Sequence, residues 1–358
     1  MKIAVIVVNW NAGEALRRCL QSVAGQERRP DRVIVVDNAS IDGSLEAMVR
    51  EFRFVEAIRL GTNVGFAAAN NLALKAAEDC DWVALLNPDA FPTPSWLASL
   101  EDASRHNPDC AVFASQLRSA ADASRLDGAG DAYHVSGLVW REGYGRRLPA
   151  YEPPREVFSA CAAAAFYRRD ALMEIGGFDE RYFCYVEDVD VGFRLRLRGH
   201  HCIYVPSAVA HHVGSSTTGR RSDFSTYHGQ RNLVWTFFKN MPAPLLALYL
   251  PQHLLLNLVN VLRFTARGQG RAVLRAEWDA LRGLPEVLRD RSQVQRTRCA
   301  RTRDLRRPMA RGWQALYRVW AQRVERERAA KHSLPIVERG SRIPPGPPLP
   351  RVTPGRSD

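Results

Sequence analysis

Apolar residues along the first part of the chain follow two different spacings. Short, mostly apolar runs such as Ile3–Val8 fit strands that are buried on both faces. Between these runs, apolar residues recur every three or four positions, which fits helices with one buried side. This alternation predicts a βαβαβαβ arrangement with a parallel sheet and right-handed crossovers. The expected strands are Ile3–Val8, Val33–Val36, Phe54–Arg59 and Trp82–Leu86, and the expected helices are Glu14–Val23, one from Asp42 or Ser44 to Arg50 or beyond, Asn70–Ala77 and one that begins at Ser95.

The pattern is weaker from residue 118 onward. Residues 118–155 are rich in Gly, Ala and charged residues and show little periodicity, which predicts a variable, partly mobile insert. Further along, Gly176 and Gly199 are placed to end two helices. The expected elements are a strand over Phe158–Tyr167, a helix over Arg169–Ile175, a helix over Asp188–Arg198 and a strand over Cys202–Val205.

An uncharged stretch, Met241–Leu262, contains no Asp, Glu, Lys or Arg. A helix that spans a membrane needs about twenty predominantly apolar residues, and polar residues and prolines interrupt this stretch. We therefore predict a helix that lies at a membrane interface with a basic flank. A helix packed on the preceding domain is the open alternative. The interrupting residues are Pro242, Pro244, Pro251, Gln252, His253, Asn257 and Asn260.

Positive charge is concentrated at the C-terminal end of the chain. The formal net charge is +12, and residues 301–358 hold fourteen Arg or Lys residues against five Asp or Glu residues. This asymmetry favours an anionic partner, with a solvated basic tail as the alternative. Residues 308–332 are expected to form a basic helix, and the Pro-rich residues 335–358 are expected to be disordered. No nucleic-acid motif accompanies the charge, so we expect no nucleic-acid partner.

The seven cysteines are scattered, with no Cys-x-x-Cys pair, and several stand in apolar contexts. This usage predicts buried thiols in a reducing compartment. The apolar N-terminus, MKIAVIVVNW, runs directly into a helical pattern and has no small-residue cleavage site. We therefore expect it to be the first strand and not a signal peptide.

Acidic residues follow two of the expected strands. Asp37 comes after the second strand and Asp89 after the fourth. Acids at the carboxyl ends of parallel strands point into the crevice where open α/β sheets bind ligands. A third acidic cluster, residues 187–190, is followed by the pair His211-His212. Together these side chains suit a hard divalent cation and a general base, although Asp37 taken alone equally suits a turn and helix cap.

Six stretches of the chain resemble, in the same order, family 2 glycosyltransferases of the GT-A fold, and in particular their bacterial rhamnosyltransferase-like branch. The resemblance implies an α/β fold with a Rossmann-like mixed sheet, helices on both faces and a C-terminal helical extension. The resemblance covers roughly residues 1–240, which we expect to be the catalytic domain. From the apolar and charge patterns described above, we expect a helical, membrane-interfacial segment over 241–300 and a basic tail over 301–358. The stretches are VVNWNAGEALRRCLQSV, VVDNASIDGS, LGTNVGFAAANN, LLNPDA, GGFDERYFCYVEDVDVGFRLRLRG and HHVGSST.

The resemblance also implies a pocket for a nucleotide-diphosphate sugar. Asp37 would contact the nucleobase, and Gly65 would permit a close approach of the backbone. Arg231 is preferred over Arg220 and Arg221 as the arginine that covers the diphosphate. The implied nucleotide-sugar contacts are Asn9, Asp37, Asn38, Asn63, Gly65, Phe66, Asn70, Asn87 and Arg231.

The implied metal and catalytic residues depart from the family pattern at one position. Asn87-Pro88-Asp89 aligns with the family's Asp-x-Asp motif, with Asn in place of the first acid. Asp89 and His212 would bind Mg²⁺ or Mn²⁺, with His211 as the alternative to His212. Glu187 and Asp188 match the family's Glu-Asp motif, and Asp188 would be the general base. The neutral Asn87 leaves the strength of the metal dependence open.

The expected function is therefore inverting transfer of a sugar, with rhamnose as one candidate, to a glycan or lipid-linked acceptor. A single displacement needs one base and no enzymic nucleophile. We expect a cytoplasmic enzyme on the inner face of a bacterial membrane, with residues 118–155 near the acceptor and the oligomeric state open.

One alternative is a nucleotidyltransferase, but residues 9–13 lack the Gly-rich, basic phosphate loop it needs. Another is a non-catalytic nucleotide-sugar-binding module.

Overall fold

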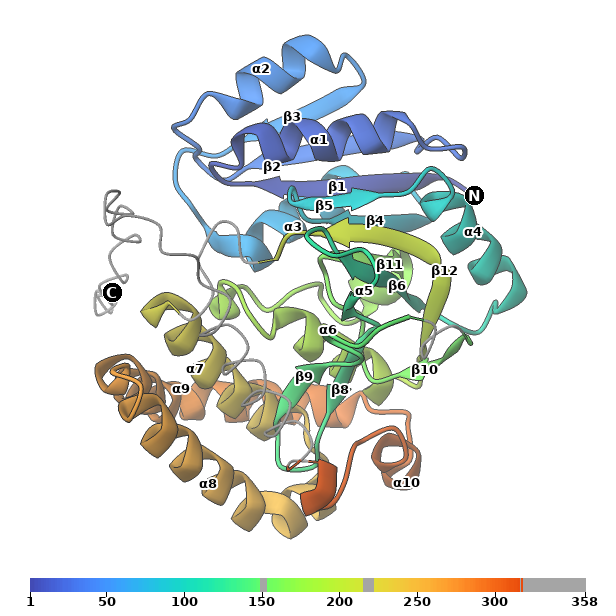
Figure 1. Ribbon diagram of the computed structural model, residues 1–358. Helices are drawn as coiled ribbons and strands as arrows, with labels where there is room; N and C mark the ends of the chain where they lie inside the picture. Colours follow the sequence, from blue (N-terminus) through green and yellow to red (C-terminus); the bar gives the residue numbers. More distant parts are fainter. Residues whose placement is uncertain (149–152, 215–221, 316, 318–358) are drawn as a thin grey trace, which may run out of the picture.

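One mixed β-sheet forms the centre of the molecule (Figure 1). The computed structural model describes residues 1–148, 153–214, 222–315 and 317. The strands of the sheet are β1 (Ile3–Asn9), β2 (Arg32–Asp37), β3 (Val55–Arg59), β4 (Trp82–Leu86), β5 (Ala90–Pro92), β6 (Val112–Ser119), β7 (Leu126–Gly128), β10 (Arg155–Val157), β11 (Ala164–Arg168) and β12 (Cys202–His212). The order β10-β12-β6-β11-β4-β1-β2-β3 contains a parallel half, β4-β1-β2-β3, as predicted. The pairs of β11 with β4 and β6 are antiparallel, so the sheet is mixed.

Helices cover both faces of the sheet because the central strands are apolar on both sides. In β1, Ile3, Val5 and Val7 pack under one layer of helices, and the alternate residues pack under the other. The first layer consists of α1 (Gly13–Ala24), α2 (Ser44–Glu51) and α4 (Trp96–His106). The second consists of α3 (Gly65–Ala76), α5 (Arg169–Glu174) and α6 (Glu187–Leu197). The short 3₁₀ helix η1 (Glu180–Tyr182) leads into α6.

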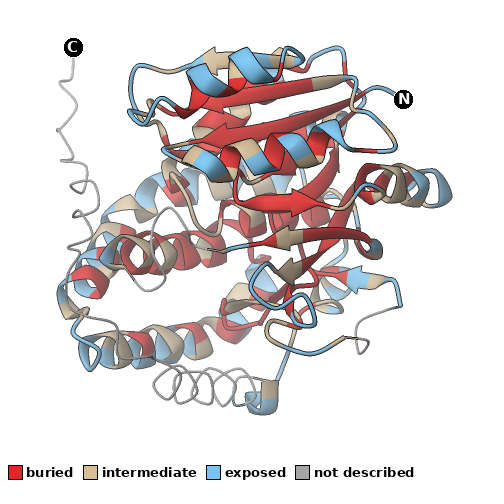
Figure 2. Ribbon diagram, turned by 45° about the horizontal axis from the view of Figure 1, so that its top comes forward, coloured by how far each residue is buried: buried red, intermediate tan, exposed pale blue. Residues whose placement is uncertain are grey.

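Four C-terminal helices form a separate group below the sheet in Figure 1. They are α7 (Asp223–Asn240), α8 (Ala243–Thr265), α9 (Gly270–Arg296) and α10 (Thr302–Arg306). The group joins the part of the chain that carries the sheet through α7, which packs against α6 and along α9. Figure 2 shows that the sheet is buried, whereas the outer helices carry many exposed turns. The predicted helical extension is thus present, and α7 connects it to the rest of the core.

Part of the segment predicted as a variable insert belongs to the core. Residues 126–138 are all buried, and β8 (Asp131–Tyr133) pairs with β9 (Val139–Arg141) in a hairpin. These strands, of three residues each, are too short to produce a detectable period. Of the predicted strand Phe158–Tyr167, only the part from Ala164 onward belongs to a strand, β11, and the last strand, β12, extends well beyond its predicted end.

The first residues of the predicted basic tail are docked on this hairpin. Ala310 N donates to Tyr133 O at 2.9 Å, and Val135 N donates to Ala310 O at 3.0 Å. Leu305 and Met309 are buried in the same apolar cluster as Phe237. The folded body therefore extends beyond residue 300. Most of the predicted helix 308–332, and all of residues 335–358, lie outside the described residues.

Candidate active site

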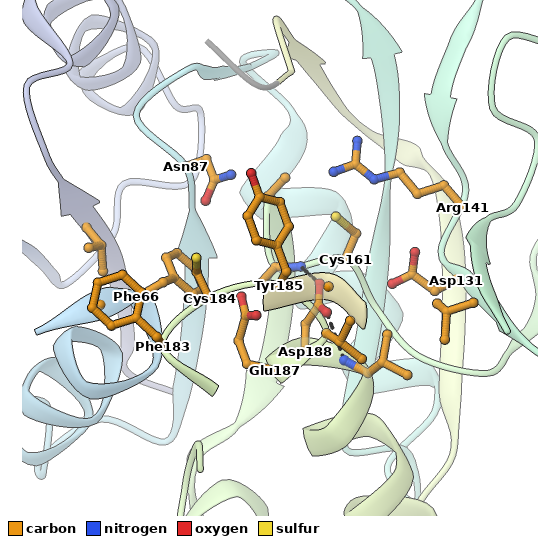
Figure 3. Close-up of a pocket in the computed structure, with 18 of the residues that line it drawn as sticks. Phe66, Asn87, Asp131, Arg141, Cys161, Phe183, Cys184, Tyr185, Glu187 and Asp188 are labelled. Atoms are coloured by element: carbon orange, nitrogen blue, oxygen red, sulfur yellow. Dashed lines mark hydrogen bonds between the residues drawn. The ribbon is translucent and has the colours of Figure 1, made fainter. Parts of the chain in front are cut away.

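A cavity of about 460 Å³ opens at the carboxyl ends of the parallel strands (Figure 3). Its wall comes from the loops after β1, β2, β3 and β4, from the first turn of α6, from the β8-β9 hairpin and from α7. This is the crevice where open α/β sheets bind ligands. The predicted site residues that line it are Asn38, Asn63, Gly65, Phe66, Asn87, Asp89, Glu187, Asp188 and His212.

Asn9, Asp37 and Asn70 lie behind this lining and support it. Asn9 Nδ2 donates to Asp37 Oδ1 at 2.7 Å, and the other carboxylate oxygen of Asp37 accepts from Ser40 N at 3.0 Å. Asn70 Nδ2 donates to Phe66 O at 2.8 Å. These bonds hold the loop after β2 and the start of α3. Contact between Asp37 and a nucleobase stays a prediction.

The loop before α3 is fixed by two asparagine side chains. Asn38 Oδ1 accepts from Val64 N at 2.8 Å, and Asn63 Oδ1 accepts from Gly65 N at 2.9 Å. Gly65 has a φ of +88°, and a Cβ atom at this position would lie 2.6 Å from the ring of Phe183. Only glycine fits such a close approach at this backbone angle. The predicted close approach at Gly65 is therefore to Phe183 of the protein itself.

His212 lies between two aspartates at one end of the cavity. Its Nδ1 lies 2.7 Å from Asp127 Oδ2, and its Nε2 lies 3.3 Å from Asp89 Oδ1. Burial lowers the pKa of His212, but the contacts with Asp127 and Asp89 outweigh it and raise the pKa above its ordinary value. Nε2 is buried and makes no hydrogen bond within the described residues. His211 pairs with Phe91 of β5 and does not line the cavity, so the structure places His212 where the metal was expected.

The three acids of α6 have different surroundings. Asp188 is half-buried and accepts hydrogen bonds from Ala162 N at 3.1 Å and from Val189 N at 2.8 Å. Burial raises its pKa. Glu187 is buried, and burial together with Asp188 raises its pKa well above the ordinary value. Asp190 instead forms ion pairs with Arg194 and Lys239 in the core, so it is structural.

Sequence reasoning missed the residues that the 118–155 segment contributes. Asp127 holds His212 and also forms an ion pair with Arg141, and both Asp131 and Arg141 line the cavity. Figure 3 shows Asp131 and Arg141 on the side of the cavity opposite Asn87. Cys161, Asp131 and Asp188 form one cluster whose ligand atoms lie within 4.8 Å of one another. The one available signal was a pair of acids, Asp127 and Asp131, in a Gly-rich stretch without helical period.

Arg231 has a different place from the one expected. It is buried, does not line the cavity, and donates from Nη2 to Arg181 O at 2.9 Å and to Tyr182 O at 3.2 Å. Its guanidinium also lies over the rings of Tyr227 and Trp235. The N–H groups of Arg231 donate to backbone carbonyls before α6, so Arg231 stabilises the protein core. It does not face the cavity, where a diphosphate was expected. Arg220 and Arg221 lie outside the described residues.

Comparison with known proteins decides the family. Residues 4–176 match the model of "Glycosyl transferase family 2". An N-acetylglucosaminyl-diphospho-decaprenol L-rhamnosyltransferase of Mycobacterium tuberculosis is 32% identical over 240 residues, which cover 61% of this chain and 78% of that protein. This chain belongs to glycosyltransferase family 2. A pre-mycofactocin glycosyltransferase of Mycobacterium tuberculosis is 31% identical over 213 residues, covering 59% of this chain and 42% of that protein.

Solved structures place this family 2 glycosyltransferase in the GT-A fold. A mannosyltransferase of Pyrobaculum calidifontis, solved with GDP-Man and Mn²⁺, has a TM-score of 0.51 at 18% identity and covers 83% of this chain and 85% of that one. GalNAc-T7, solved with UDP, GalNAc and Mn²⁺, has a TM-score of 0.54 at 16% identity and covers 67% of this chain and 48% of that one. These structures confirm the predicted α/β fold, and the family match and the Mycobacterium tuberculosis relative confirm the predicted glycosyltransferase function.

Proposed function

We propose that this glycosyltransferase is an inverting, metal-dependent enzyme in which Asp188 is the general base. The observation that carries the proposal is the presence of Asp188 and of the Asp89–His212 pair in one cavity. One part of the cavity offers a carboxylate for the acceptor hydroxyl, and another offers a cation site for a diphosphate.

The Asp89–His212 pair fits a divalent cation. His212 Nε2 lacks a hydrogen bond within the described residues although it lies only 3.3 Å from Asp89 Oδ1. Two donor atoms at that separation suit one cation bound at ~2.0–2.2 Å from each. Asp127 would hold the Nδ1–H of His212 and so turn the Nε2 lone pair toward the ion, as carboxylates do behind metal-bound histidines. We expect Mn²⁺ or Mg²⁺, which would stabilise the negative charge on the leaving diphosphate.

The chain's own residues would act on the acceptor. Asp188 takes the proton of the acceptor hydroxyl while the hydroxyl oxygen bonds to the anomeric carbon of the donor sugar. The bond from that carbon to the diphosphate oxygen breaks on the opposite side, which inverts the anomeric configuration. Two backbone N–H groups keep the Asp188 carboxylate in place for this step.

The relatives suggest the class of donor and acceptor. The Mycobacterium tuberculosis relative is named for transfer of L-rhamnose to N-acetylglucosaminyl-diphospho-decaprenol. We propose a nucleotide-diphosphate L-rhamnose as donor and a sugar on a lipid diphosphate as acceptor. Such an acceptor would place the active site beside a membrane surface.

We further propose that α8 and α9 rest on an anionic membrane, on the inner face of a bacterial cell membrane. Exposed leucines at positions 248, 255, 258 and 262 form one stripe along α8. Leu274, Trp278 and Leu281 are exposed on α9. Of the described helices, α8 is long and apolar enough to span a bilayer, with a mean hydropathy of 1.5. The opposite side of α8 is tied to the protein, since His253 Nδ1 lies 2.8 Å from Ser136 O, so an interfacial position fits better.

The decisive experiment is a transfer assay with the full chain. A nucleotide-diphosphate L-rhamnose and a short-chain N-acetylglucosaminyl-diphosphate lipid would be incubated with Mn²⁺, with Mg²⁺ or with EDTA. We expect a glycosylated lipid of inverted anomeric configuration, as read by NMR, with each ion but not with EDTA. Retention of configuration would refute the single displacement, and equal rates in EDTA would refute the metal site.

A further inference from the structure

A buried carboxyl group on the β8-β9 hairpin has no role in the chemistry described above. Asp131 is 4% exposed, yet it lines the cavity. Within the described residues no group donates a hydrogen bond to its side chain, and the neighbouring charges that act on it are Asp188, Arg141, Glu142 and Asp127. Its carboxyl oxygens are not among the fully buried side-chain atoms that lack a hydrogen-bonding partner, so they are open to the cavity. A carboxyl group that faces a cavity and receives no hydrogen bond from the protein has both oxygens available to a ligand.

Asp131 and Asp188 form a carboxyl pair with unequal surroundings. Their ligand atoms lie within 4.8 Å of each other, in the same cluster as Cys161. Asp188 accepts two backbone hydrogen bonds and sits in the first turn of α6, which favours its charged form. Asp131 has neither advantage, and burial and the Asp188 charge raise its pKa well above the ordinary value. Protonation is therefore favoured at Asp131 over Asp188, which leaves Asp188 available as the base.

We propose that Asp131 determines acceptor specificity by hydrogen bonding to the ring hydroxyl next to the one that Asp188 deprotonates. This inference rests on the proposed function and adds a recognition residue to it. Hydrogen bonds between hydroxyl and carboxyl oxygens span ~2.5–3.0 Å. Two carboxyl groups within 4.8 Å of each other can therefore contact neighbouring hydroxyls of one sugar ring. A protonated Asp131 can donate as well as accept in this contact.

The test is a cycle of enzyme variants and acceptor analogues. Wild type, Asp131→Asn and Asp131→Ala would be assayed with the short-chain N-acetylglucosaminyl-diphosphate lipid and with analogues that each lack one ring hydroxyl. One analogue loses the attacked hydroxyl and gives no product. With the analogue that lacks the ring hydroxyl next to the attacked one, we expect the kcat/KM of wild type to fall by about 10- to 100-fold. Asp131→Ala should show that loss with the complete acceptor and little further loss with the analogue.

Tyr133→Phe is the matched control on the same strand. The hydroxyl of Tyr133 is buried without a hydrogen bond in the described residues, and its ring packs on Phe158 and Phe193 away from the cavity lining. This variant should keep the acceptor preference of wild type. All variants should retain the donor KM, and thermal melting would verify that they are folded.

The outcomes separate this inference from the proposed function. If wild type transfers sugar, and folded Asp131→Ala shows the same loss with the analogue as wild type, Asp131 does not recognise the acceptor and the proposed function stands. If Asp131→Asn and Asp131→Ala alter the donor KM and not the acceptor KM, the residue serves the donor and the inference fails. If wild type hydrolyses the donor but glycosylates no acceptor, the acceptor class is wrong and the inference fails with it.

Discussion

Replacement of Asp188 by Asn should remove the proposed general base while leaving the protein folded. The side chain keeps its shape, but an amide has one acceptor oxygen for the two N–H groups of Ala162 and Val189. Loss of one hydrogen bond costs about 0.5–1.5 kcal/mol. Removal of a carboxylate beside buried Glu187 offsets part of that cost, because the two acids raise each other's charging energy. We therefore expect a melting temperature close to that of wild type.

The effect on catalysis should be much larger than the effect on folding. Loss of a general base reduces rates by about 10²- to 10⁴-fold, which corresponds to ~2.7–5.4 kcal/mol in the barrier. Transfer would be followed by release of nucleotide diphosphate, and donor binding by calorimetry. We expect kcat to fall while the donor Kd stays within about twofold.

The pH dependence provides a second readout for Asp188. Burial raises the pKa of Asp188 above its reference value of 3.8. Because the base must be ionised, wild-type kcat/KM should fall as pH decreases through this raised pKa. The acid limb should therefore lie above pH 3.8, and Asp188→Asn should lack it. A folded Asp188→Asn enzyme with near-normal transfer and an unchanged acid limb would refute the assignment.

Three further predictions concern the metal, the buried acid and the membrane. Asp127→Asn should weaken the binding of nucleotide diphosphate in Mn²⁺ by about 10- to 100-fold, while binding in EDTA should change little. Calorimetry would measure both affinities, and an equal loss of affinity in Mn²⁺ and in EDTA would make Asp127 purely structural. Burial and the charge of Asp188 raise the pKa of Glu187, so folding favours the protonated form of this side chain. The contribution of that form to the stability of the fold is lost as pH rises above the reference value of 4.5 and through the raised pKa. Glu187→Gln should therefore raise the melting temperature at neutral pH but not at pH 4, and a pH-independent difference would contradict this reasoning. Leu258→Gln in α8 should weaken binding to anionic liposomes at low salt, whereas Ile41→Gln, at a 93% exposed position before α2, should not; sedimentation with liposomes showing no binding by wild type would exclude the membrane surface.

The sequence by itself determined the parallel half of the sheet and the placement of two acids near its carboxyl edge. Strand and helix periods are local, and in β1, β2 and β4 the apolar pattern agrees with the burial that the fold imposes. The position of Asp89 follows from β4 alone, since a residue just beyond a parallel strand reaches the crevice. The start of α6 was likewise readable, because its acids occupy a helix N-terminus and Gly199 follows its end.

Only the tertiary structure decided which polar residues meet in the cavity. His211 and His212 are adjacent, but successive residues of a strand face opposite sides, so the register of β12 against β5 and β6 selects His212. Arg231 follows the histidine pair along the chain, and its charge suits a diphosphate. Its guanidinium instead donates hydrogen bonds to the backbone carbonyls of Arg181 and Tyr182, which precede α6. Asp127 and Asp131 lie in strands of three residues that carry no period, and long-range pairing brings them to His212 and Asp188. Local pattern sets the elements, whereas contacts between residues far apart in sequence depend on packing that no local period encodes.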